Sequence, residues 1–184
     1  MEKTILGIRQ QIAVAVCTSL LVAGCVRKPQ SSSENYALAK GLFEQTSKGF
    51  HIPAADASGA EKFRLQKLAE AGYKNVLKLY PGEDYWAAQA MRSLGNIYAA
   101  QTNVDAAVKQ FIQVERNYPQ REWEVLMALK SAADLLWESG RCEEARPFYR
   151  KIVQKFDRPD ASQVVLTVVR GSKHRLDDRG DRSA

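Results

Sequence analysis

The residues best suited to covalent or metal chemistry are scarce in this chain and lie far apart in the sequence. They are Cys17, Cys25, Cys142, His51 and His174. Their separations match no zinc-site spacing, and no two cysteines flank a loop that a disulfide would close in the later chain. Because catalysis needs a nucleophile, a base or a metal held within mutual reach, we expect no metal, no cofactor and no enzymatic activity.

Cys25 differs from the other two cysteines because of the segment before it. An apolar stretch over residues 12–24 follows the cations Lys3 and Arg9, which is typical of a bacterial export signal. The stretch is shorter than the roughly 20 residues that span a bilayer. The alternative is an uncleaved membrane anchor that ends by chance in a cysteine.

The sequence Leu21-Val22-Ala23-Gly24-Cys25 resembles the lipobox of bacterial lipoproteins. The resemblance implies that residues 1–24 are removed as a signal peptide and that Cys25 carries fatty acyl chains such as palmitate, which anchor the protein. In Gram-negative lipoproteins an Asp after the cysteine favours the inner membrane, and Val26 stands there instead. In a two-membrane bacterium this implies an outer-membrane anchor facing the periplasm. A flexible, Ser-rich tether then covers residues 25–34.

The rest of the chain repeats with a period of 38 residues. Four columns of similar residues recur three times: Ala69, Ala107 and Ala145; Tyr73, Phe111 and Tyr149; Val76, Val114 and Ile152; Tyr80, Tyr118 and Phe156. Within each unit the columns are 4, 3 and 4 residues apart, which places them on one face of a helix. A fixed period in this range predicts a stack of helical hairpins. We expect small residues, such as Gly95 and Ala107, to let the two helices of a hairpin approach closely.

The middle unit resembles the tetratricopeptide repeat in its residues Leu94-Gly95-x-x-Tyr98, Ala107, Phe111 and Pro119. The resemblance implies an all-α fold, a superhelix of about three helical hairpins over residues 35–170. The first unit is less regular: we expect helices over 35–45 and 60–79, separated by a long loop over 46–59 that is rich in breakers.

The end of the repeat domain is predicted to be a capping helix. It begins near Asp160 and ends near Arg170, and its valines could cover the open end of the stack. Its β-branched content keeps a strand as the alternative. From residue 171 to 184 the chain is polar and mixed in charge, which predicts a disordered tail.

A second helical face, distinct from the core face, is the candidate binding site. In the middle unit it holds Gln89, Arg92 and Asn96, and the 38-residue shift adds Lys130, Asp134 and Trp137 from the next unit. Arg92 and Asn96 resemble the positions with which tetratricopeptide domains clamp a peptide carboxylate. Asp134 lies one turn from Lys130 and could neutralise it. The alternative is an ordinary solvated helix face.

These features favour a membrane-anchored periplasmic scaffold that binds a protein partner or peptide in a concave groove. The plan is similar to that of the BamD-type outer-membrane assembly lipoproteins, over about three hairpins where that family has five. Alternatives are a scaffold for peptidoglycan enzymes, a support for a pilus or secretion channel, and, in a different class, a small-ligand or peptidoglycan-fragment binding protein. The net charge of +6 forms no basic stripe, so we expect no nucleic-acid partner.

Overall fold

The computed structural model describes residues 32–178, and every regular element in that range is a helix, with no strand. The prediction of an all-α fold is confirmed. The predicted signal peptide and the predicted lipidation site, Cys25, lie outside the described residues. Within the described range, no helix is both long enough and apolar enough to cross a membrane.

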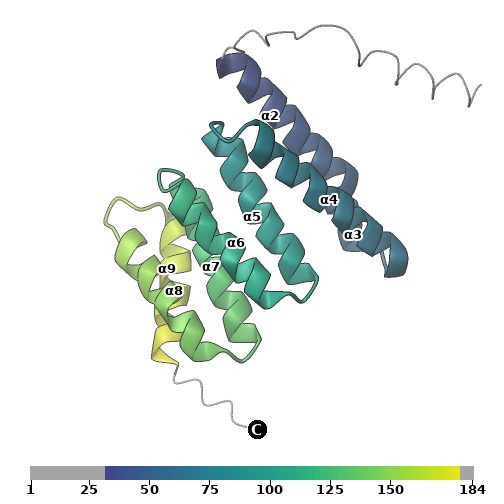
Figure 1. Ribbon diagram of the computed structural model, residues 1–184. Coiled ribbons are helices and arrows are strands. Elements are labelled where there is room, and N and C mark those ends of the chain that lie inside the picture. Colours follow the sequence, from purple (N-terminus) through teal and green to yellow (C-terminus); the bar gives the residue numbers. More distant parts are fainter. Residues whose placement is uncertain (1–31, 179–184) are drawn as a thin grey trace, which may run out of the picture. The chain divides into compact units, whose positions relative to one another are not determined.

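The helices follow one another along the chain with short connections (Figure 1). Their bounds are α2 (Ser32–Thr46), the π-helix η1 (Ser47–His51), α3 (Ile52–Asp56), α4 (Gly59–Leu79), α5 (Asp84–Ala100), α6 (Val104–Asn117), α7 (Glu122–Glu138), α8 (Cys142–Phe156) and α9 (Gln163–Asp177). From α4 onward each helix packs mainly on its neighbours in sequence, and α5 also contacts α2 and α7. Three hairpins, α2–α4, α5–α6 and α7–α8, therefore stack in chain order, and α9 packs on α8.

The repeated columns form the core of this stack. The alanine column, Ala69, Ala107 and Ala145, is completely inaccessible to solvent. The aromatic and aliphatic columns that follow it are buried as well, and only Tyr80 of the last column is partly exposed. Burying such columns on successive hairpins gives a continuous hydrophobic core, which supplies most of the driving force for folding.

The 38-residue period also appears in the contacts between hairpins. Gln120 donates a hydrogen bond to Asp84, and 38 residues later Arg158 donates two to Glu122, over 2.9 and 3.1 Å. The first contact joins the turn before α7 to the first turn of α5, and the second joins the segment before α9 to the first turn of α7. The last hairpin therefore holds the segment before α9 in the way that the middle hairpin holds the turn before α7, as the sequence period predicts.

Gly95 permits the closest approach in the middle hairpin. A Cβ atom built at this position would lie 2.4 Å from Cε1 of Phe111. The expected tight contact is present, although the group that touches Gly95 is the Phe111 ring rather than Ala107. No residue with a side chain fits here unless that ring moves.

The predicted long loop over residues 46–59 is wrong, because most of it is helical. The helix η1 continues from α2, and α3 follows after it with Pro53 in its first turn, where a missing N–H is harmless. Ala54 is buried and Phe50 packs on the core of the first hairpin. Apolar burial thus outweighs the breakers, and only residues 57–58 remain irregular before Gly59, whose φ of +53° makes the turn.

Both boundaries of the predicted repeat domain also need correction. Helix α2 begins at Ser32, so the predicted tether is already helical over its last three residues. At the other end α9 continues to Asp177, where we expected a disordered tail from residue 171, and the strand alternative is wrong as well. Ser172 is buried there, and Arg146 donates hydrogen bonds of 2.9 and 2.8 Å to the carbonyl oxygens of Leu176 and Asp178. These contacts hold a polar sequence in helical form.

Candidate binding groove

Three of the predicted site residues, Gln89, Arg92 and Asn96, lie together on one face of α5. They line a solvent-open groove of about 470 Å³ between α5 and the segment that runs from the end of α2 to α3. We call it the α5 groove; its other lining residues are Phe43, Ser47, His51, Ile52, Ala55, Tyr73 and Ser93. The helical spacing of 3 and 4 residues therefore correctly places these three side chains on one face of α5, and their role in binding stays a prediction.

Arg92 is not the free cation that the sequence suggests. Its Nε donates to Oε2 of Glu124 over 2.5 Å, and the Glu124 side chain, at the start of α7, is only 7% exposed. The terminal nitrogens of Arg92 donate no further hydrogen bond to the described residues. Arg92 therefore ties α5 to α7 with one N–H and keeps the rest of its guanidinium at the groove.

The two amide side chains of the groove have unused hydrogen-bonding capacity. Nε2 of Gln89 is buried and has no partner among residues 32–178. The Asn96 side chain, which is half-buried, likewise makes no hydrogen bond within that range. Leaving a buried amide unpaired costs about 1–3 kcal/mol, so these groups favour a ligand that supplies acceptors.

His51 and Tyr73 close the groove at the η1 side. His51 Nδ1 and the Tyr73 hydroxyl are 2.9 Å apart, and the two rings meet edge to face. Burial and, secondarily, the charge of Arg92 lower the pKa of His51 below 6.5, so the imidazole is neutral at neutral pH. Sequence reasoning missed both residues: it placed His51 in a loop and assigned Tyr73 only to the core. The one available indication is that a hydroxyl in a core column needs a partner.

The other predicted site residues do not join the α5 groove. Lys130 and Asp134 of α7 line a hollow of about 290 Å³ beside α8 and α9. Lys130 donates to Asp134, and the Tyr149 hydroxyl donates to the same carboxylate over 2.7 Å. Trp137 lies next to this hollow, with the Arg175 guanidinium carbon 5.1 Å from its ring centroid. The polar groups here are largely paired with one another.

The chemistry available to the α5 groove is hydrogen bonding to a bound molecule. Its polar lining consists of one cation, two amides, two serine hydroxyls, the Tyr73 hydroxyl and a neutral imidazole. Among the described residues, no group of three or more His, Cys, Asp or Glu side chains is arranged to hold a metal ion. The chain matches no protein-family model and no curated protein.

Proposed function

We propose that this protein is a lipid-anchored scaffold that binds a segment of another protein in the α5 groove and performs no chemistry of its own. The observation that carries the proposal is that two amide side chains, Gln89 and Asn96, have no hydrogen-bond partner in the described part of the chain. They lie beside the Arg92 guanidinium, of which only Nε donates a hydrogen bond there. An extended polypeptide presents carbonyl oxygens at regular intervals and ends in a carboxylate. Both are acceptors that these donors would bind.

The stacked hairpins support a role in recognition. The repeated columns form the regular core of the hairpins. The residues on the other face of α5 can therefore be suited to a binding partner. The tetratricopeptide-like superhelix that the motif of the middle hairpin implies would present this face as part of a concave surface. The open form of the groove suits a chain segment better than a small enclosed ligand.

The anchoring part of the proposal rests on the sequence before residue 32. A lipobox ending at Cys25 would attach the mature protein to the outer membrane, with the repeat domain in the periplasm. We propose that its partner belongs to an envelope machine, with outer-membrane protein assembly as the first candidate. Peptidoglycan enzymes and a pilus or secretion channel are the alternatives that partner identification would distinguish.

The groove assignment is tested by cross-linking in living bacterial cells. A photoreactive amino acid is placed at Asn96 and, as the matched control, at Gln154, which is exposed on α8 and makes no hydrogen bond in the described part of the chain. We expect an adduct with one discrete partner from position 96 only. The purified partner should then bind Gln89→Ala and Asn96→Ala about tenfold more weakly, the cost of one lost hydrogen bond or more, and Gln154→Ala normally. Equal binding by all three variants would exclude the groove.

The anchor is tested separately by mass spectrometry of the mature protein. We expect an amino-terminal, acylated Cys25, and a soluble or unprocessed Cys25→Ser variant. A free amino terminus at any other residue would contradict the lipoprotein assignment and leave the groove assignment standing. The two halves of the proposal can therefore fail independently.

A further inference from the structure

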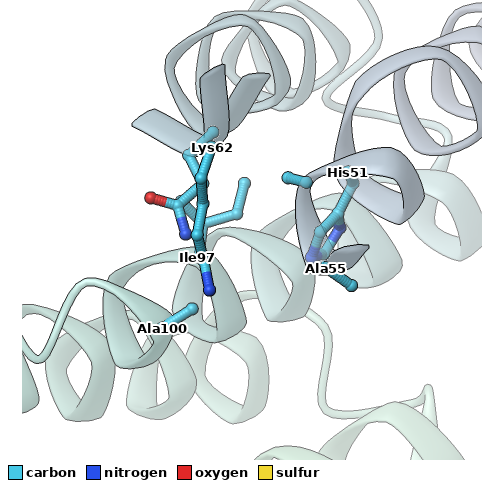
Figure 2. A pocket seen from close by; sticks show the side chains of 7 residues that line it. His51, Ala55, Lys62, Ile97 and Ala100 are labelled. Atoms are coloured by element: carbon cyan, nitrogen blue, oxygen red, sulfur yellow. The ribbon is translucent and has the colours of Figure 1, made fainter. Parts of the chain in front are cut away.

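A second, smaller hollow lies between α3, α4 and α5. It has a volume of about 110 Å³ and is lined by His51, Ala54, Ala55, Lys62, Gln66, Ile97 and Ala100. Figure 2 shows Lys62 and His51 on opposite sides of the hollow, with Ile97 and Ala100 of α5 below Lys62 and Ala55 below His51. At roughly 30 Å³ for a water molecule in the liquid, the hollow has room for a group of a few heavy atoms.

Two of the three polar side chains that line this hollow, Lys62 and Gln66, have no partner among residues 32–178, and its lining contains no acid. Gln66 is only 7% exposed, and its side chain makes no hydrogen bond within residues 32–178. Lys62 is half-buried, and in the same range its ammonium group forms no ion pair. An ammonium and a buried amide that face a shared space without an acceptor favour an anionic ligand.

His51 is the third polar residue that lines the hollow, and one of its two ring nitrogens already has a hydrogen-bond partner. Its Nδ1 is hydrogen-bonded to Tyr73, so only Nε2 remains for a ligand in either of the two hollows that it lines. The remaining walls, Ala54, Ala55, Ile97 and Ala100, are apolar and small except for Ile97. A ligand that fits this lining has one charged end and a short aliphatic end.

We propose that this hollow binds a small aliphatic carboxylate. Lys62 would pair with the carboxylate, Gln66 would donate a hydrogen bond to it, and the alanines and Ile97 would contact the aliphatic part. The same chemistry belongs to a free short-chain acid and to the carboxyl-terminal residue of a peptide. The site shares His51 and Ala55 with the α5 groove but is distinct from it, because its other lining residues, Lys62, Gln66, Ile97 and Ala100 among them, do not line that groove.

The test uses the full chain in a non-ionic detergent, with binding followed by NMR shifts and calorimetry. The probes are butyrate and N-acetyl-alanyl-alanine, with butyramide as the uncharged control. A ligand with so few atoms should bind with a dissociation constant on the order of 1 mM. Lys62→Ala removes a charged hydrogen bond and should weaken binding about tenfold or more. Ala100→Leu fills the hollow at an exposed position and should also weaken it.

Lys78→Ala is the matched control, because it removes the same charge from the exposed last turn of the same helix. Unchanged binding by Lys78→Ala, with loss in the other two variants, supports the site. Stronger binding of the peptide acid identifies a chain terminus as the natural ligand, whereas equal binding identifies a free acid. Failure of both acids to bind, equal binding of butyramide, or equal binding by Lys62→Ala and Lys78→Ala would overturn the proposal, with no consequence for the α5 groove.

Discussion

The middle hairpin, α5–α6, and the last hairpin, α7–α8, have the same backbone plan but use their polar side chains differently. A shift of 38 residues pairs Arg92 with Lys130, Asn96 with Asp134, and Phe111 with Tyr149. In the last hairpin these three positions bind one another: Asp134 accepts hydrogen bonds from both Lys130 and Tyr149. The polar groups of that hairpin are therefore used within the fold.

In the middle hairpin the corresponding groups are not used in this way. Phe111 has no hydroxyl, and Arg92 turns to Glu124 on the next hairpin instead of to Asn96. Asn96 is left without a partner in the described range, and so is the buried amide of Gln89, whose counterpart in the last hairpin is Met127. Two hairpins with the same backbone can therefore differ in binding capacity, because the fold pairs the polar side chains of one and leaves those of the other available for a ligand.

The largest effect is expected where the two hairpins are tied together. Arg92→Ala leaves the buried Glu124 carboxylate without its partner, and because Arg92 itself is 24% exposed we expect a loss of about 2–4 kcal/mol of unfolding free energy. Lys130→Ala breaks a pair whose side chains are 42% and 31% exposed, and should cost less than about 1 kcal/mol. Urea unfolding followed by circular dichroism measures both.

A control shows whether the loss comes from the unpaired charge. The double variant Arg92→Met, Glu124→Met replaces both charges by apolar side chains of similar size. It should regain most of the unfolding free energy that Arg92→Ala loses. Equal losses for Arg92→Ala and Lys130→Ala would mean that the pair between the hairpins is no more important than a surface pair. Because Arg92→Ala weakens the fold, it is unsuitable as a sole test of partner binding.

The next effect concerns the close contact at Gly95 of the middle hairpin, where the last hairpin has an alanine. Gly95→Ala places a methyl group against the Phe111 ring and should cost about 1–3 kcal/mol through overpacking, although Ala is the better helix former. The last hairpin already has Ala133 at the equivalent position, where Ala133→Gly should cost about 1 kcal/mol or less. Thermal unfolding of both variants checks the difference. A Gly95→Ala variant as stable as the parent would show that the ring moves aside freely.

A smaller effect follows from exchanging the two aromatic residues. Tyr149→Phe removes the hydroxyl bound to Asp134, and should cost about 0.5–1.5 kcal/mol, since that carboxylate is partly solvated. Phe111→Tyr introduces a hydroxyl where the last hairpin has one, within expected reach of Asn96. It should change stability little and weaken partner binding to the α5 groove, which an affinity measurement detects. Unweakened binding would show that Asn96 is not part of the contact.

Sequence periodicity predicts the parts of this fold that repeat. The columns beginning at Ala69, Ala107 and Ala145 identify three buried helix faces, because burial of apolar residues at helical spacing determines them. The same spacing on the other face of α5 brings Gln89, Arg92 and Asn96 together. These are local properties of one helix, and so they are visible without a structure.

The unpredicted features depend on contacts that the period does not contain. Arg92 and Glu124 are 32 residues apart, which does not match the 38-residue period. An acid such as Glu124 is also expected in a first helical turn on dipole grounds alone. Their pairing therefore could not be recognised from the sequence. The helical form of residues 47–56 and of α9 beyond Gly171 depends on packing against other helices, which outweighs local breakers and polarity.

The smallest effect is expected from the first hairpin, where the aromatic hydroxyl meets a titratable partner. Tyr73 contacts His51 in the way that Tyr149 contacts Asp134. Burial, with the charge of Arg92, lowers the pKa of folded His51 below its ordinary value of about 6.5, so the unfolded chain takes up the proton first. Stability should therefore be complete above about pH 6.5, decline as the pH falls through the window below it, and level off beneath the folded pKa. The urea midpoint measured from about pH 7.5 to pH 5 follows this change.

His51→Asn keeps an acceptor for the Tyr73 hydroxyl and removes the titrating group, so the decline should shrink. His174→Asn, at an exposed position of α9, is the control and should retain it. A decline that survives in His51→Asn would assign the pH dependence to other groups and remove the distinction between the first hairpin and the last.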